Sequence, residues 1–358
     1  MTPAATSGFV HDVPASRVVF GTGRIRQVPE EVERFGAERV LLIAGRREKV
    51  YADELAAALG SRVVDRIGEV VMHVPVALAT AAAERTERSG ADLLVCLGGG
   101  SAIGLAKAVA LRTRLPILAI PTTYAGSEMT PIWGLTDGGR KTTGRDRTVL
   151  PATVVYDPAL TTSLPIDISA ASGMNALAHL IEALYAPDAS PVTAVLAEEG
   201  IRVLADALSR VVVAPDDLDA RACALYGAWL AGWVLGTAGM GLHHKICHVL
   251  GGAYNLPHAG THSAVLPFVT AYNAPAAPAA MVHAARALGA QDPARALWEL
   301  AERIGAPTSL AQVGMDPGRI PEAARLVVES PPVNPRPVDE AAVAELLRAA
   351  HAGMPTGT

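Results

Sequence analysis

The sequence predicts two domains of different fold class. Residues 1–160 are predicted to form an α/β domain on a parallel sheet, and residues 161–358 an all-α domain. In the first part, short β-branched runs alternate with helical stretches, which is typical of a parallel sheet covered on both faces. From about residue 168, long Ala/Leu-rich segments with helical periodicity take over. At 358 residues and 50% hydrophobic content, the chain is also longer than a single domain with one compact core usually is.

The elements of the first domain follow from short apolar runs separated by glycine turns and amphipathic segments. A glycine turn follows the first strand and leads into a polar helix that ends at Arg34. The predicted strands cover residues 17–20, 39–45, 61–67, the start of 91–101, and 116–123. The other predicted helices cover residues 49–59, 75–90 and 102–112.

The second domain is predicted from apolar residues at helical spacing, interrupted by Pro and Gly. No strand alternation follows residue 168. The predicted helices cover residues 171–185, 191–209, 216–236, 242–252, 279–288, 293–304 and 339–351.

Composition narrows the classes of function. The formal net charge is −5 and no long basic run occurs, so we expect no nucleic-acid partner. No apolar run approaches the roughly 20 residues of a membrane helix, and the N-terminus lacks a signal-peptide pattern. The three scattered cysteines, Cys96, Cys223 and Cys247, suit reduced thiols in the cytoplasm.

A glycine-rich loop follows the fourth predicted strand. Gly98, Gly99, Gly100 and Ser101 stand between this strand and a helix. Glycines there let a backbone approach a pyrophosphate, and the helix N-terminus offers free N–H groups. The spacing is not the G-x-G-x-x-G fingerprint, so a tight strand-to-helix turn is the alternative interpretation.

A second loop, residues 120–130, contains Thr122, Thr123 and Ser127 after the fifth predicted strand. A further glycine turn occupies residues 20–24. Loops of a parallel sheet that follow its strands meet at the carboxyl edge, where such sheets bind ligands. The first domain is therefore predicted to be a Rossmann-like dinucleotide-binding domain.

Five of the ten histidines fall within residues 241–262. His244 and His248 are four residues apart, on one face of a predicted helix, and His258 follows ten residues later. Asn175 and His179 are also four apart on another helix. Three histidines and one oxygen ligand could hold a divalent ion. His243 and His262 are expected to line the same region, and surface histidines are the alternative.

Two features argue against a tight metal site. Asn175 stands where a carboxylate would neutralise the cation, and a neutral amide is a weak ligand. Lys245 adds positive charge beside His244 and takes the place of the glutamate in the zinc-protease signature. The histidines therefore favour a pocket that handles protons and binds an anion, with no metal.

Several long motifs, in order, resemble one known superfamily. These are GGGS, PTTYAGSE, NALAHLIEA, HHKICHVLG and LPHAGTH. The chain resembles the iron-containing (group III) alcohol dehydrogenase superfamily over nearly its whole length, and its maleylacetate reductase branch in particular. The resemblance implies the dehydroquinate synthase-like architecture of that superfamily and a homodimer.

The resemblance also implies roles for individual residues. Metal-dependent members bind their ion through an Asp and three His, at positions that match Asn175, His179, His244 and His258; we call these the inherited ligand positions. The maleylacetate reductase branch lacks the Asp and works without metal. His248 matches a histidine near the nicotinamide. The cofactor is NADH or NADPH, with Gly45 and Arg46 in the cofactor site; Arg46 and Arg47 could meet a 2′-phosphate, or could be solvated.

The implied reaction is reduction of the conjugated C=C of maleylacetate, a dicarboxylate, to 3-oxoadipate in aromatic-compound degradation. His244 and His248 are expected to stabilise the enolate and deliver the proton, while His179 and His258 shape the pocket. The expected substrate-binding residues are Tyr124, Lys245, His243, Arg145 and Asn175.

Alternative functions stay open at this point. They are a metal-dependent alcohol or polyol dehydrogenase of the same superfamily, a cyclase of the dehydroquinate synthase class, and a non-catalytic nucleotide-binding protein. The fourth alternative is a related enzyme that acts on another enone or ketone in a biosynthetic pathway.

Overall fold

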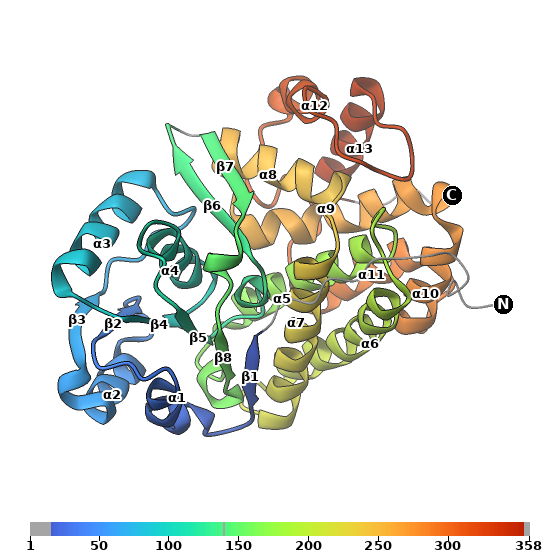
Figure 1. Ribbon diagram of the computed structural model, residues 1–358. Coiled ribbons are helices and arrows are strands. Elements are labelled where there is room, and N and C mark those ends of the chain that lie inside the picture. Colours follow the sequence, from blue (N-terminus) through green and yellow to red (C-terminus); the bar gives the residue numbers. More distant parts are fainter. Residues whose placement is uncertain (1–15, 139, 354–358) are drawn as a thin grey trace. The chain divides into compact units, whose positions relative to one another are not determined.

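The computed structural model describes residues 16–138 and 140–353, and its contacts divide them into two units, residues 16–164 and 165–353. The division lies four residues beyond the predicted boundary at 160/161. The first unit contains a six-stranded parallel sheet and the second contains helices (Figure 1). The predicted fold class is confirmed.

The sheet of the first unit has the strand order β1-β8-β5-β4-β2-β3, and all its pairings are parallel. The strands are β1 (Arg17–Phe20), β2 (Val40–Ala44), β3 (Val63–Ile67), β4 (Leu93–Gly98), β5 (Ile117–Pro121) and β8 (Thr153–Tyr156). Its helices are α1 (Val28–Arg34), α2 (Lys49–Leu59), α3 (Val76–Ser89) and α4 (Gly100–Thr113).

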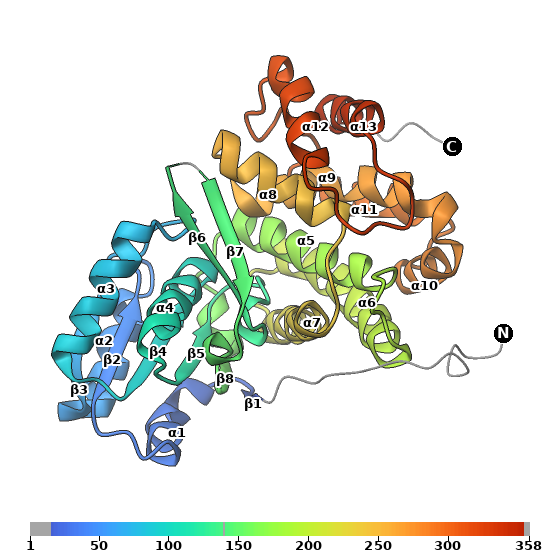
Figure 2. The same ribbon diagram turned by 45° about the horizontal axis from the view of Figure 1, so that its top comes forward.

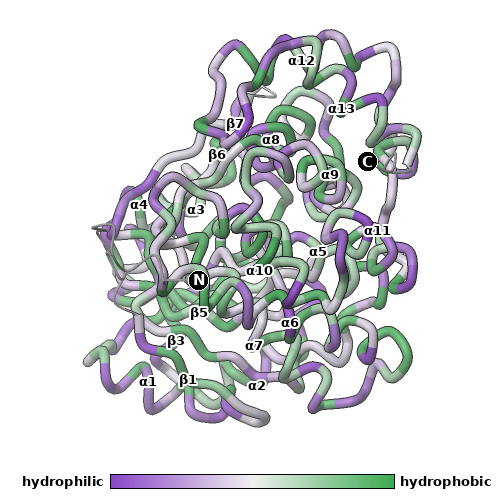
Figure 3. Tube along the Cα trace, turned by 90° about the vertical axis from the view of Figure 1, so that its right-hand side faces the viewer, coloured by the Kyte–Doolittle hydropathy of each residue, from purple (hydrophilic) through white to green (hydrophobic). Residues whose placement is uncertain are grey.

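The inner strands β2, β4 and β5 are buried along their whole length and are apolar rather than alternating, as the hydrophobic colouring of β5 in Figure 3 illustrates. Val40, Leu42 and Ala44 share one core cluster with residues of α1 and α2. The helices α3 and α4 cover the opposite face (Figures 1 and 2). Parallel strands joined by helices in this way place the connecting loops at the carboxyl edge.

The prediction misses an antiparallel hairpin and the sixth strand of this unit. The hairpin is formed by β6 (Ile132–Asp137) and β7 (Arg140–Arg145), and Asp137-Gly138 begins its turn, a common hairpin signal. The four residues of β8 are too short to show a period. Their place between β1 and β5 depends on long-range pairing.

The second unit is helical, with α5 packed against α6, α7 and α9 (Figures 1 and 2). The prediction misses α9 and α12. Most of α9 is buried on all sides and it contains Pro267, so it shows no amphipathic period. The helices are α5 (Ile166–Ala183), α6 (Pro191–Val213), α7 (Leu218–Thr237), α8 (Leu242–Tyr254), α9 (His258–Asn273), α10 (Pro278–Leu288), α11 (Pro293–Arg303), α12 (Ile320–Val328) and α13 (Glu340–Ala352).

No single helix in the described ranges is long and apolar enough to cross a membrane. By length and composition, α7 and α8 pass that test only as a pair, and they are bent by 98° relative to each other.

A buried lysine anchors the loop that follows β5. Lys107 lies on α4 with its side chain 1% exposed. Its ammonium donates to the carbonyls of Ser127 (2.6 Å), Thr130 (2.7 Å) and Ile132 (2.9 Å). Burial lowers the pKa of Lys107 to about 7, although the neighbouring Glu128 opposes this shift. This one side chain therefore holds the second predicted cofactor loop against α4.

Replacing Lys107 with Met should destabilise the protein by about 3 kcal/mol, because three buried carbonyls would lose their donor. Urea unfolding of the purified variant measures this. Lys49→Met, which removes an exposed ion pair with Asp53, is the matched control and should unfold near the wild-type midpoint. Equal midpoints for both variants would refute the anchoring role.

Candidate active site

The structure brings two predicted loops together at the carboxyl edge of the sheet. The N-cap of α4 is Gly99, which has no side-chain cap, so no side chain occupies the N–H groups of Gly100 and Ser101. Gly98 has φ of +150°, and a Cβ there would lie 2.8 Å from Cβ of Ala102. A Cβ on Gly99 would lie 2.8 Å from Cγ2 of Thr123. This loop therefore requires glycine, because a Cβ at position 98 or 99 would overlap a neighbouring side chain.

Glu48 is a component of this edge that the sequence analysis missed. Its carboxylate accepts a hydrogen bond from the hydroxyl of Thr122 (3.1 Å), and a Cβ on Gly45 would lie 3.1 Å from its Oε2. It is the N-cap of α2, only three residues after Gly45. An acidic residue soon after the second strand of such a sheet is the signal that could have identified it.

The other predicted cofactor residues lie in the same unit. Gly100 and Ser101 begin α4, and Thr122 and Thr123 follow β5. The hydroxyl of Ser127 is buried without a hydrogen-bond partner among the described residues. The edge therefore offers glycine backbone, hydroxyls and one carboxylate, which are groups suited to a nucleotide.

A cavity of about 280 Å³ lies at the ends of β2 and β3. Gly45, Arg46, Lys49 and Arg66 line it, together with Asp53. Lys49 and Arg66 both bind Asp53, at 2.6 and 2.7 Å. The exposed guanidinium of Arg46 makes no hydrogen bond or ion pair within the described part of the chain. One cation beside this cavity is thus available to an anion.

In the helical unit, six histidines form a continuous cluster. They come from α5 (His179), α8 (His243, His244, His248) and the first turns of α9 (His258, His262). Neighbouring ring centroids lie 4.5 to 6.4 Å apart. His179, His243, His244 and His262 are buried, whereas His248 and His258 are half-buried. The helical unit therefore brings together the six histidines that the sequence analysis named.

Glu182, which the sequence analysis also missed, organises this cluster. Its carboxylate accepts the backbone N–H groups of His243 (2.9 Å) and His244 (3.3 Å), in the first turn of α8, and also contacts Nδ1 of His244. A carboxylate at a helix N-terminus satisfies free donors and complements the dipole. Gly241, the N-cap, leaves room for it, because a Cβ there would lie 3.1 Å from Oε1.

A hydrogen-bonded chain runs from Glu182 to Asn175. His179 Nδ1 lies 2.7 Å from His244 Nε2, and Asn175 Nδ2 lies 3.3 Å from His179 Nε2. Since the carboxylate of Glu182 can only accept, neutral His244 donates through Nδ1 and accepts at Nε2. His179 then donates through Nδ1 and accepts the amide N–H at Nε2. Asn175, His179 and Glu182 are spaced i, i+4 and i+7, the pattern that could have revealed Glu182.

Neighbouring charged groups and burial shift the pKa values of this cluster in opposite directions. Burial raises the pKa of Glu182, but His244 and His243 outweigh it, so the net shift is downward and the group stays a carboxylate. Burial lowers the pKa of His243 to about 3, and it also lowers that of His262. Both imidazoles are therefore neutral.

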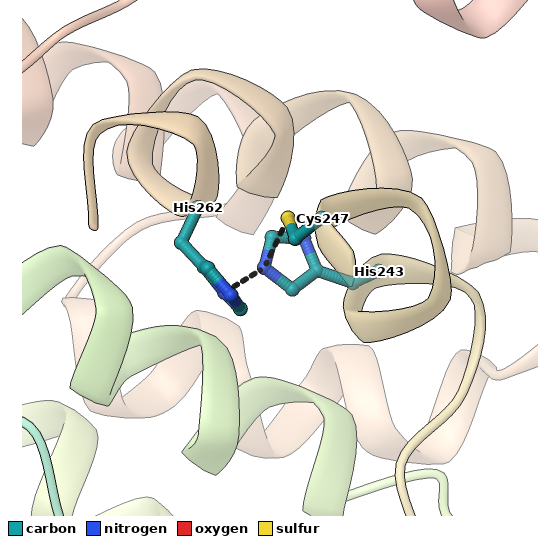
Figure 4. A group of neighbouring side chains, drawn as sticks. All are labelled: His243, Cys247 and His262. Atoms are coloured by element: carbon teal, nitrogen blue, oxygen red, sulfur yellow. Dashed lines mark hydrogen bonds between the residues drawn. The ribbon is translucent and has the colours of Figure 1, made fainter. Parts of the chain in front are cut away.

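The inherited ligand positions do not fit a metal ion in this arrangement. Both nitrogens of His179 and both of His244 are engaged in the chain of hydrogen bonds. Asn175 supplies an amide in place of an anionic oxygen. The one group of three His, Cys or acidic residues that could hold a metal within the described residues is His243, Cys247 and His262 (Figure 4).

The predicted substrate-binding residues differ in burial and do not all lie in the same unit. His243 and Asn175 belong to the cluster, and Lys245 is half-buried on α8. Tyr124 is fully buried in the α/β unit, and Arg145 is exposed at the end of β7. Their contact with a substrate stays a prediction.

Replacing Glu182 with Gln should destabilise the helical unit by about 3 kcal/mol, because the amide can no longer accept from every one of its buried donors. Chemical unfolding followed by circular dichroism measures this. Replacing Glu198, whose carboxylate pairs with His283 and Arg286 nearer the surface, gives a matched Glu→Gln control with a smaller loss. A Glu182→Gln variant as stable as wild type would contradict the assignment.

Comparison with known proteins identifies the family of this chain. Residues 15–158 match the family described as iron-containing alcohol dehydrogenase, and residues 169–351 match the C-terminal part of the Fe-containing alcohol dehydrogenase family. The chain is 53% identical to a maleylacetate reductase of Sphingobium indicum, over 97% of this chain and 98% of that protein. It is 50% identical to a maleylacetate reductase of Burkholderia cepacia, over 97% and 99%.

Solved structures show the same fold. The maleylacetate reductase of Rhizobium sp. strain MTP-10005 superposes with a TM-score of 0.92 at 46% identity, covering 97% of this chain and 99% of that one. An iron-containing alcohol dehydrogenase of Corynebacterium glutamicum gives a TM-score of 0.93 at 49% identity, over 97% and 98%. The chain belongs to the iron-containing alcohol dehydrogenase family, in the branch of the maleylacetate reductases, and is an oxidoreductase.

Proposed function

We propose that this protein reduces the conjugated C=C bond of maleylacetate to give 3-oxoadipate, with NADH or NADPH and without a metal ion. The observation that carries the proposal is the chain from Glu182 to Asn175, in which an amide ends the chain at an inherited ligand position. Relatives at about half identity carry the name maleylacetate reductase.

The nucleotide is expected to bind at the carboxyl edge of the sheet. The N–H groups at the start of α4 and the glycine backbone of 98–100 suit its pyrophosphate. The Glu48 carboxylate suits a ribose hydroxyl, and Arg46 suits a 2′-phosphate. When bound, NAD(P)H supplies a hydride to the alkene carbon β to the ketone of the substrate.

The substrate then carries an enolate, which the protein must stabilise and protonate. A conjugated enone is already electrophilic, so hydrogen-bond donors can meet its oxygen without a Lewis acid. Simple alcohols or ketones gain far more from a metal ion. This difference in chemistry is a physical reason why an amide is tolerated at position 175.

The Glu182 chain can hold the proton that this step needs. When His244 is protonated, its Nε2–H donates to Nδ1 of His179, and the direction of the chain reverses. His179 Nε2–H then requires an acceptor, which the amide of Asn175 provides by turning its oxygen inward. Oδ1 of Asn175 is buried and otherwise unpartnered among the described residues. An amide serves both directions, whereas a carboxylate could only accept.

His248 and His258 are the less buried members of the cluster. We assign His248, one helical turn beyond His244 and with its ring centroid 6.1 Å away, to proton delivery beside it. His179 and His258 shape the pocket, and half-buried Lys245 is placed to attract a substrate carboxylate. A negatively charged dicarboxylate suits this histidine-rich, lysine-bearing helix.

The test follows the near-ultraviolet absorbance of reduced nicotinamide during turnover of freshly generated maleylacetate, with and without EDTA. We expect rapid turnover that is indifferent to the chelator. Loss of activity in EDTA at an unchanged unfolding midpoint, with recovery on adding Fe²⁺ or Zn²⁺, would identify a metal-dependent dehydrogenase instead. Tight nucleotide binding without turnover would require a different enone or ketone substrate.

The matched variant for this assay is Asn175→Asp. A carboxylate cannot donate to His179 Nε2 and would repel the developing enolate, so kcat should fall about tenfold or more. The thermal midpoint and the nucleotide Kd check that the fold is retained. Unchanged kcat would remove the amide from the mechanism.

Arg46→Ala tests the cofactor assignment. Because the guanidinium would make a charge-assisted hydrogen bond to a 2′-phosphate, its loss should raise the Kd of NADPH about tenfold and leave that of NADH nearly unchanged. Fluorescence titration of the reduced nucleotides measures both. Arg88→Ala, an exposed arginine on α3, is the control. Equal effects on the two nucleotides would exclude a 2′-phosphate contact.

A further inference from the structure

A second group of potential ligands lies beside the chain of Glu182, on α8 and α9. His243, Cys247 and His262 point toward one another, and their ligand atoms all lie within 4.8 Å (Figure 4). His243 Nε2 lies 2.9 Å from Nδ1 of His262 and 3.7 Å from Sγ of Cys247. All three side chains are at most 1% exposed. This group shares no residue with the inherited ligand positions.

The local fold explains why these atoms converge. His243 and Cys247 are one helical turn apart on α8, so they face the same side. Asn255 ends α8 in the left-handed conformation, with φ of 53°, and Pro257 precedes α9. This short corner returns the chain so that His262 on α9 faces the same point. Two elements of one rigid corner therefore supply the three ligands.

One of the three distances between these ligand atoms is that of a tetrahedral site, and all three lie within 4.8 Å. Zinc bonds of about 2.0–2.1 Å to nitrogen and 2.3 Å to sulfur place N and S about 3.6 Å apart and two nitrogens about 3.4 Å apart. The distance of 3.7 Å between His243 Nε2 and Sγ already matches. The two imidazole nitrogens at 2.9 Å need to separate by only about half an ångström.

We propose that His243, Cys247 and His262 bind one zinc ion, with Cys247 as the thiolate. Binding forms the Zn–S bond and releases the thiol proton to solvent, while each imidazole contributes a lone pair. Two nitrogens and one sulfur select borderline and soft cations over Mg²⁺ or Ca²⁺. The ion and thiolate leave one positive charge, and the buried carboxylate of Glu182, bound to the backbone N–H of His243, carries a charge of opposite sign.

Such an ion would join α8 to α9 and stabilise the fold, and it has no part in the hydride step. The inference is therefore independent of the proposed function. Bound zinc raises the unfolding midpoint because the ligand set exists only in the folded state.

The test loads Co²⁺, as a spectroscopic probe for Zn²⁺, into the full-length protein after chelator treatment. We expect one Co²⁺ per chain, an intense near-ultraviolet thiolate-to-cobalt band, and loss of that band when Zn²⁺ is added. Cys247→Ser should lose the band. Cys223→Ser, a half-buried cysteine on α7, and Asn175→Ala, at an inherited position, should both keep it. Zn²⁺ should raise the unfolding midpoint of wild type but not of Cys247→Ser.

X-ray absorption of the zinc-loaded wild type gives an answer that does not depend on any variant folding. It should show one sulfur and two imidazole nitrogens around the ion. A zinc site without sulfur, a cobalt band that survives Cys247→Ser, or the absence of Co²⁺ and Zn²⁺ binding would overturn the proposal. Uptake of Cu⁺ alone would overturn the assignment to zinc.

Discussion

The arrangement of the histidine cluster depends on one buried carboxylate. Glu182 accepts the N–H groups of His243 and His244 at the start of α8 and contacts the His244 ring. A helix N-terminus and an imidazole together compensate the cost of burying this charge. The same contacts set where α8 begins relative to α5, and they set the tautomer of His244. Each further hydrogen bond, through His179 to Asn175, follows from that choice.

The two units position their candidate site residues by different kinds of contact. At the sheet edge, Gly98 and Gly99 allow the turn before α4 to pack closely, because a Cβ on either would overlap Ala102 or Thr123. In the helical unit, the side chains of Glu182, His244, His179 and Asn175 form hydrogen bonds with one another. Lys107 and Glu182 have parallel roles, since each is a buried ionisable group that binds backbone: Lys107 the loop after β5, and Glu182 the first turn of α8. Neither has to contact a ligand to be essential for the site it supports.

Asn175 connects the structure to the chemistry of the family. Three histidines stand at the inherited ligand positions, and the ring nitrogens of His179 and His244 bond to protein groups. An amide can take part in such a chain in either direction, which a metal-binding carboxylate cannot. The group of His243, Cys247 and His262 lies beside this chain, because His243 directly precedes His244 on α8. Burial keeps His243 and His262 neutral, which allows six imidazoles to lie so close together.

The sequence alone was sufficient for the fold class and the glycine loop, and it named all six clustered histidines and Asn175 as candidates for one site. Strand–helix alternation, glycine spacing and i, i+4 pairs involve residues close together in the chain, so one amino-acid sequence is enough to recognise them. It did not reveal Glu48, Glu182 or Lys107, because a buried charge is recognisable only from partners far along the chain. Nor did it reveal α9, whose burial on all sides removes its period. Tertiary structure decided which nitrogen faces which partner, since hydrogen-bond direction depends on distances that sequence spacing does not contain.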